Sequence, residues 1–287
     1  MAAETNATIV IVTDQRFVLP VFILVLSLRR YQVQARIHVL GIDLSCQDRR
    51  LFTQLPGVEV FATDLPPGTD AVSRRAVANI VKGDALLTAA DVDTDYIALL
   101  DGDSVVTGDI TPYLVPDRPG LYARARPPEE DALICDTYYT PGDQRGAIPR
   151  QILNAWREDI GERSEPRRPN TLLSGNLMIH RDYLDFVYRW REHMLNVLPY
   201  NRRPFNHVAY SMMGDFTLSS TYLFVHRVPP LFPAPFNKAP AASVVHLGPH
   251  PKYWKLWPRN KLPYFDLVVT CLEQAEAKGY DLPTLPW

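Results

Sequence analysis

The chain has 287 residues, of which 46% are hydrophobic and 22% are charged, and its formal net charge is -2. This length and apolar content are enough to bury a sizeable core in one large domain or two small ones. The near-neutral balance lacks the basic excess with which nucleic-acid-binding proteins neutralise phosphates, so no nucleic-acid partner is expected.

Cysteine usage and the first apolar run bear on the cell compartment. The three cysteines are Cys46, Cys135 and Cys271. They are far apart and form no CxxC pair, which predicts neither a disulfide framework nor a zinc site and favours a reducing cytoplasm. The apolar run 18–26 is too short to span a bilayer, and acidic Glu4 and Asp14 precede it where a secretory leader would be basic. We interpret this run as a buried helix.

Strands and helices alternate in the first hundred residues. A β-branched run at 7–12 predicts a buried parallel strand. In the helix after it, Pro20 fits the first turn and Arg29-Arg30 fit the C-terminal end. Further strands are predicted at 37–42, 58–62 and 95–100, with helices at 47–54 and 71–90 between them. This alternation predicts an α/β domain with a mostly parallel sheet.

The pattern is looser beyond residue 109. Strands are predicted at 121–125 and 173–180, helices at 148–158 and 182–197, and a polar loop at 161–170. Many of the 26 prolines fall in the last third of the chain. They indicate long ordered loops that wrap on the sheet, not a second independent core.

Two acids follow the predicted strand 95–100: Asp101 and Asp103, with Gly102 between them. In extended backbone, residues two apart project to the same side, so both carboxylates are expected to point from the carboxyl end of the strand. Open α/β folds bind ligands at that end. Adjacent carboxylates repel, and a hard divalent cation such as Mg²⁺ or Mn²⁺ relieves the repulsion and would bridge a diphosphate. Solvated acids in a turn are the alternative interpretation.

Four segments, in the same order along the chain, resemble the retaining glycosyltransferases of family 8. They are Ile11–Asp14 with the helix after it, Leu99–Asp103, Ser174–Ile179 and Val245–Trp254. The resemblance covers nearly the whole chain and implies a GT-A glycosyltransferase fold with a Rossmann-like, mostly parallel central sheet flanked by helices. It also implies a single domain over 1–287, with a nucleotide-sugar-binding half at 1–110 and an acceptor-binding half with a C-terminal helix at 111–287.

The resemblance implies roles for individual residues. The donor-binding residues would be Thr13, Asp14, Lys82, Asp101, Gly102, Asp103, Gly175, Asn176, Gly248 and Lys252. Within this set Thr13-Asp14 would contact the uridine of a UDP-sugar, and Gly248 and Lys252 its diphosphate. Lys82 fits a solvated helix face equally well.

The resemblance also implies a metal site and catalytic residues. Asp101, Asp103 and His246 would bind Mn²⁺ or Mg²⁺, with His250 as the alternative to His246. The catalytic residues would be Lys252, which stabilises charge on the departing diphosphate, and Asp215, which bonds the hydroxyls of the transferred sugar.

The chain departs from the family pattern at four points. Leu173 stands in place of Asn, His246 lies one residue closer to Gly248, Tyr253 replaces the Pro of Lys-Pro-Trp, and Phe216 replaces the Gln of an Asp-Gln pair. A neighbouring family on the same GT-A fold is therefore the alternative to family 8.

The expected activity is metal-dependent transfer of a hexose from a UDP-sugar to a hydroxyl group of a glycan or glycoconjugate, with retention. A nucleotidyltransferase acting on sugar phosphates is one alternative, disfavoured because no Gly-rich phosphate loop follows the first strand. A glycan-binding protein without turnover is the other, motivated by the departures.

The aromatic stretch at 253–259 fits an acceptor groove or a membrane interface. The expected location is cytoplasmic, with peripheral contact at the inner face of the membrane as the alternative, and polysaccharide biosynthesis is the expected context.

Overall fold

A computed structural model shows how these segments are arranged. It describes residues 6–63, 74–126, 158, 172–197, 214–215, 217–219, 221–222, 229–235, 244–247 and 264–284. The chain forms two compact units, each built from stretches that are distant in the sequence. Unit 1 comprises Met1–Asp64, Asp91–Asp117 and Pro235–Trp287, and unit 2 comprises Leu65–Ala90 and Arg118–Ala234. Among the described helices, none is long and apolar enough to cross a membrane.

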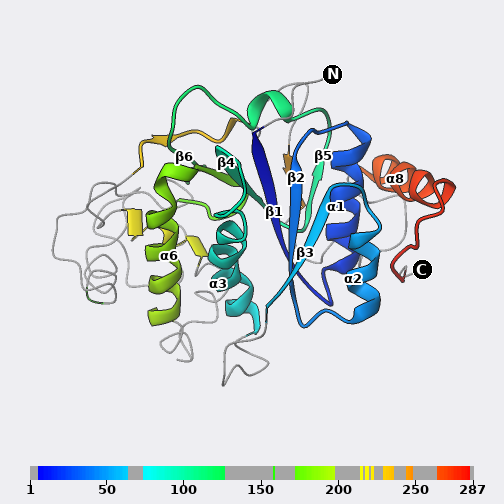
Figure 1. Cartoon of the computed structure of the whole chain (residues 1–287), viewed down its shortest axis with the longest axis horizontal. Helices are drawn as coiled ribbons and strands as arrows, with labels where there is room; N and C mark the ends of the chain where they lie inside the picture. Colours follow the sequence, from blue (N-terminus) through cyan, green and yellow to red (C-terminus); the bar gives the residue numbers. More distant parts are fainter. Residues whose placement is uncertain are drawn as a thin grey trace. The chain divides into compact units, whose positions relative to one another are not determined.

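Four parallel strands form the sheet of unit 1, in the order β3-β2-β1-β4 (Figure 1). They are β1 (Ala7–Asp14), β2 (Arg36–Ile42), β3 (Val58–Thr63) and β4 (Tyr96–Leu100). The predicted α/β fold with a mostly parallel sheet is therefore confirmed. The chain winds outward from β1 to β3 and then returns to pair β4 with the other side of β1. Such a switch of direction places a ligand crevice outside the carboxyl ends of β1 and β4.

Three helices of unit 1 accompany this sheet. They are α1 (Val18–Arg30), α2 (Cys46–Thr53) and α8 (Phe265–Ala277). In α1 every residue from Val18 to Leu28 is buried, which confirms the buried helix predicted for the apolar run. A helix that is apolar on all sides needs neighbours on all sides, and α1 contacts β1, β5 (Ser104–Val106), α2 and α8. Figure 1 shows α8 lying against α1, in red beside blue.

Unit 2 contains a smaller set of strands in the order β7-β6-β8. They are β6 (Leu121–Tyr122), β7 (Leu177–His180) and β8 (Leu231–Phe232). Helices α3 (Arg74–Leu87) and α6 (Leu184–Val197) pack against each other, and a short 3₁₀ turn at Arg181–Tyr183 precedes α6 (Figure 1). The helices approach closely at Gly83, where an added Cβ would lie 3.0 Å from the Cβ of Arg191. An ion pair between Asp84 and Arg191 joins the same faces.

Two strands of unit 2 are shorter than predicted. The strand predicted at 173–180 begins only at Leu177, because Asn176 has a left-handed backbone with φ of 52° that ends extended pairing. The strand predicted at 121–125 ends at Tyr122, and Ala125 makes only an isolated bridge to Leu172. The helix predicted at 148–158 and the loop at 161–170 lie outside the described residues, apart from helical Glu158.

A buried polar network between α6 and Thr217 is expected to make the stability of unit 2 depend on pH. The indole N–H of Trp190 donates to the Thr217 hydroxyl at 2.9 Å, and His193 Nδ1 lies 3.3 Å from the Thr217 carbonyl oxygen. Burial lowers the pKa of His193 to about 3. Between that value and the ordinary pKa near 6.5, the unfolded state binds a proton that the folded state does not.

The free energy of unfolding is therefore expected to fall as the pH falls below about 6.5, by at most about 1.4 kcal/mol per pH unit for this one group. His193→Gln is expected to make that dependence shallower, because the variant has no imidazole to protonate on unfolding. Urea denaturation of both proteins at three pH values between neutral and weakly acidic measures the difference in slope. Identical slopes would contradict the assignment to His193.

Candidate functional site

The two acids of the Asp101-Gly102-Asp103 segment lie in a tight turn. Strand β4 ends at Leu100, and the Ser104 amide N–H donates to the Asp101 carbonyl oxygen at 3.0 Å. The two carboxylates lie close together as predicted, but a turn and not extended backbone brings them there. The turn itself folds the two side chains toward one another, and a short strand, β5 (Ser104–Val106), follows at once.

A distant segment adds an imidazole to this turn. Strand β9 (Val244–His246) pairs antiparallel with β5, and the register places His246 opposite Ser104. The Leu247 amide N–H extends the pairing by donating to the Asp103 carbonyl oxygen at 2.8 Å. The β-branched valines of both segments favour the ribbon, so the backbone register brings His246 to the acids.

The three side chains converge on one point. His246 Nε2 lies 3.0 Å from an Asp103 carboxylate oxygen and 3.7 Å from an Asp101 carboxylate oxygen. One ligand atom from each residue lies within 4.8 Å of the others. Asp103 is only 5% exposed, so its charge needs compensation from a nearby positive group.

The donor set fits a divalent cation. Two atoms bound to one cation at about 2.0–2.6 Å lie no more than about 4–5 Å apart, which the observed spacing satisfies. Carboxylate oxygens suit Mg²⁺ or Mn²⁺, and an imidazole nitrogen shifts the preference toward the transition metal. The three residues that the sequence analysis put forward as metal ligands are thus brought together.

Gly102 allows the turn to pack against β1 and α1. A Cβ at this position would lie 2.6 Å from Val21 Cγ2 and 3.2 Å from the Val12 carbonyl oxygen. Both distances are shorter than ordinary contacts. The absence of a side chain thus permits close packing of the turn. This packing holds the two acids at the carboxyl end of β1.

Gly102→Ala is expected to lower the free energy of unfolding by about 1–3 kcal/mol and to weaken Mn²⁺ binding, because the turn must move away from α1. Thermal unfolding and titration of free Mn²⁺ by electron paramagnetic resonance measure the two effects. Adding Val21→Ala removes the closest clashing atom and is expected to recover Mn²⁺ affinity. Unchanged affinity in Gly102→Ala alone would contradict this role.

Thr13 and Asp14, the predicted uridine-binding pair, end β1. The Asp14 carboxylate accepts the amide N–H groups of Arg16 at 2.8 Å and Phe17 at 3.2 Å, and it pairs with the Arg16 guanidinium at 2.9 Å. Thr13 is 1% exposed. Asp14 therefore caps the turn that leads into α1, and its contact with a nucleoside stays a prediction.

In unit 2, Asp215 is the centre of a polar cluster. One carboxylate oxygen accepts the Ser174 amide N–H at 2.7 Å and the Ser174 hydroxyl at 2.8 Å. The other accepts from the Arg126 guanidinium at 2.6 Å, and both side chains of this ion pair are largely buried, at 16% and 14% exposure. Three donors, one of them cationic, are thus fixed around one largely buried carboxylate.

The backbone explains why these residues meet. The Leu173 amide N–H donates to the Arg124 carbonyl oxygen at 2.8 Å, so the segment carrying Arg126 runs antiparallel beside the segment carrying Ser174. The Ser219 hydroxyl donates to the Asp215 carbonyl oxygen at 2.6 Å and accepts the Leu172 amide N–H at 2.7 Å. Ser219 therefore fastens the helical turn of Asp215 to the same segment.

Other residues predicted for the donor lie beside this cluster. Lys82, on α3, reaches the Ser174 hydroxyl at 3.5 Å, the long limit of a hydrogen bond, and is half-buried. Gly175 and Asn176 continue from Ser174, and Asn176 is 5% exposed. Lys82, Ser174 and Asp215 thus form one connected group.

Sequence reasoning missed Arg126. Its only signal was a cation directly after the strand predicted at 121–125, which is common at strand ends. Several residues that the sequence analysis connected with the site lie outside the described residues: Phe216, Gly248, His250, Lys252 and the aromatic stretch at 253–259.

Comparisons with known proteins give similarity only at the level of structure. No family model matches the chain, and no curated protein is similar in sequence. A crystal structure of the glycosyltransferase GlyE from Streptococcus pneumoniae TIGR4 is 14% identical, with a TM-score of 0.49, and covers 98% of this chain. This chain spans 65% of that structure's length. An active-site mutant of LgtC is 15% identical, with a TM-score of 0.46, over 93% of this chain and 95% of its own.

Proposed function

We propose that this chain is a metal-dependent glycosyltransferase of the GT-A type, which transfers a hexose from a UDP-sugar to a hydroxyl group of a glycan or glycoconjugate. The observation that supports it most is the convergence of Asp101, Asp103 and His246 beside the carboxyl end of a parallel sheet. That edge is where α/β folds bind nucleotides, and a cation held there suits a diphosphate.

Asp101, Asp103 and His246 hold Mn²⁺ or Mg²⁺ in this proposal. When bound, such a cation neutralises charge on the nucleoside diphosphate as it leaves. The turn and the β5–β9 ribbon hold the three ligands in place before the substrate arrives. The ligands therefore need little reorganisation during the reaction, which is how preorganised electrostatic groups lower a barrier.

Asp215 and its neighbours recognise hydroxyl groups in this proposal. Ser174 and Arg126 hold the carboxylate in a fixed orientation, and carboxylate oxygens accept hydrogen bonds from sugar hydroxyls. Lys82 contributes a cation on the same side. Four parts of the proposal rest on the sequence resemblance alone. They are contact of Thr13-Asp14 with uridine, contact of Gly248 and Lys252 with the diphosphate, membership of family 8, and retention of configuration.

A donor panel with Mn²⁺ tests the activity. Each UDP-sugar is incubated with the full chain without acceptor, and UDP release is measured with and without EDTA. Slow, EDTA-sensitive hydrolysis of one donor is expected and would identify the sugar. A parallel incubation with a nucleoside triphosphate and a sugar 1-phosphate covers the nucleotidyltransferase alternative. Pyrophosphate release there, with no UDP release from any donor, would overturn the proposal.

A further inference from the structure

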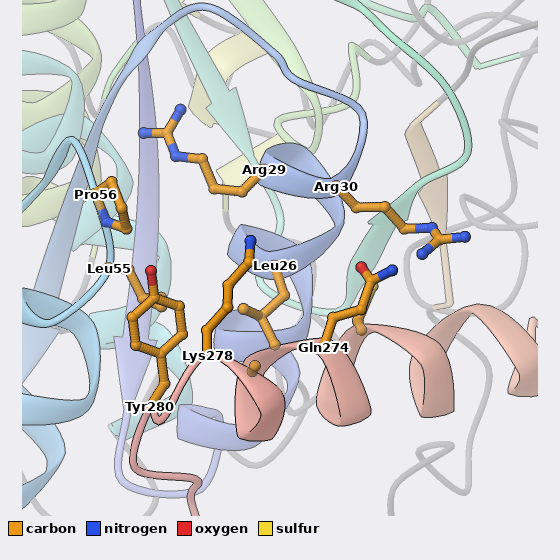
Figure 2. Close-up of a pocket in the computed structure, with 10 residues that line it drawn as sticks. Leu26, Arg29, Arg30, Leu55, Pro56, Gln274, Lys278 and Tyr280 are labelled. Atoms are coloured by element: carbon orange, nitrogen blue, oxygen red, sulfur yellow. The ribbon is translucent and has the colours of Figure 1, made fainter.

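A hollow of about 230 Å³ in unit 1 lies at the opposite end of α1 from the metal-binding turn. Its walls come from the last turn of α1, the segment before β3, and the C-terminal half of α8 (Figure 2). The turn at Gly102 packs on the first turn of α1, and α1 has 13 residues. A helix of this length is roughly 20 Å long, so the hollow is separate from the proposed donor site.

The floor of the hollow is apolar and its rim is cationic. Leu26, Leu55, Cys271 and Ala275 form buried parts of the lining. Three cationic residues line it as well, Arg29, Arg30 and Lys278, and no lining residue is acidic. Like charges around one hollow repel each other, and an anion between them relieves the repulsion.

Arg29 is a half-buried cation, and its hydrogen-bond partners in the described part of the chain are neutral groups. Its two terminal nitrogens donate to the carbonyl oxygens of Val33, Ala35 and Gly57 at 3.0–3.3 Å. Its Nε is buried without an acceptor, and within the described part of the chain no carboxylate pairs with it. Burial lowers the pKa of Arg29, although an arginine stays charged at any physiological pH. A half-buried cation that pairs with no carboxylate in the described chain favours an anion nearby.

The remaining polar groups of the rim are held in place by the chain after α8. Gln54 makes two hydrogen bonds of 2.8 Å with the backbone of Asp281, and the Tyr280 amide N–H donates to the Ala275 carbonyl oxygen at 3.0 Å. These bonds fix Tyr280 beside Leu55. Figure 2 shows the Lys278 ammonium and the Tyr280 hydroxyl directed to the side of the hollow on which Arg29 lies, while Arg30 extends away from them.

We infer that this hollow binds a small amphiphilic anion, in which a phosphate or carboxylate is joined to a short alkyl or aryl group. The charged group would lie against Lys278 and Tyr280 beside Arg29, and the apolar group against Leu26 and Leu55. The volume is below the roughly 300–1,000 Å³ of pockets for drug-sized ligands. It therefore suits one short chain or ring and not a whole glycan or nucleotide.

Calorimetric titration of the full chain with hexyl phosphate tests the inference, with inorganic phosphate and hexyl glucoside as separate probes. Hexyl phosphate is expected to bind more tightly than either, because only it carries both groups. Lys278→Gln is expected to weaken it about tenfold, the value of one charge-assisted hydrogen bond. Arg49→Gln, which changes an exposed cation on α2, is the matched control and is expected to bind unchanged.

Several results would overturn the inference. One is that hexyl glucoside binds as tightly as hexyl phosphate. Another is that Arg49→Gln weakens hexyl phosphate binding as much as Lys278→Gln does, and a third is that Lys278→Gln leaves this binding unchanged. Amide chemical shifts of Ala275 and Tyr280 that stay constant during the titration would also contradict it, whatever the affinity. Vesicles of anionic lipid are the last probe: binding to them without binding to monomeric hexyl phosphate would show a membrane surface in place of a ligand pocket. None of these measurements depends on UDP release.

Discussion

Asp103→Ala is expected to abolish Mn²⁺-dependent release of UDP from every donor sugar, a loss on the order of 10²–10³-fold or more. The substitution removes the ligand that is most buried and that lies 3.0 Å from His246 Nε2. Two ligands hold a cation less well than three, and loss of a direct ligand should weaken Mn²⁺ binding by more than the roughly 10–100-fold cost of an outer-shell change. Turnover and Mn²⁺ titration by electron paramagnetic resonance measure both effects.

Two further variants separate metal binding from folding. Asp103→Asn keeps the shape of the side chain and removes its charge, so it is expected to lose Mn²⁺ while unfolding at a similar temperature. Asp117→Ala removes an exposed acid in the same unit and is expected to change neither measurement. Full turnover in Asp103→Ala would overturn the metal assignment. Retained Mn²⁺ affinity with lost turnover would move Asp103 from metal ligand to direct contact with substrate.

The fold of unit 1 could be predicted from sequence because its signals are local. The β-branched run at 7–12 and the apolar runs at 37–42 and 96–100 are each long enough to be recognised as buried parallel strands. Alternation with helices then leaves few arrangements of the sheet. The start of the strand predicted at 173–180 could not be placed from sequence, because the left-handed backbone of Asn176 has no signal in the apolar pattern.

The candidate site was predictable only in part, because half of its geometry is non-local. The step from β4 to Asp101 and Asp103 is visible in the sequence, but the turn that folds them together is not. His246 meets them through a strand pairing between segments some 140 residues apart, which no periodicity reveals, and only the family resemblance pointed to it. Arg126 lacked even that signal, since its ion pair depends on three segments of unit 2 meeting around Asp215.

Asp215→Ala is expected to destabilise unit 2 by about 3–5 kcal/mol, the usual cost of removing one partner of a buried ion pair. Arg126 would be left buried without its carboxylate, and the Ser174 amide N–H would lose the acceptor that lies at 2.7 Å. Glu192→Ala is the matched control in the same unit, because the Arg189–Glu192 pair is about 60% exposed on both sides and should contribute under about 1 kcal/mol. Urea denaturation measures both variants, and equal effects would contradict a central role for Asp215.

A local measurement separates structural support from substrate recognition at Asp215. Hydrogen exchange of the Ser174 amide is expected to accelerate in Asp215→Ala, because its N–H loses the carboxylate acceptor. In Asp215→Asn the side-chain oxygen still accepts that N–H, so the amide should stay protected while the charge is gone. If Asp215 recognises sugar hydroxyls through its charge, Asp215→Asn should lose most turnover while keeping the protected amide. Asp215→Asn with a protected amide and normal turnover would restrict Asp215 to holding Ser174 and Arg126 in place.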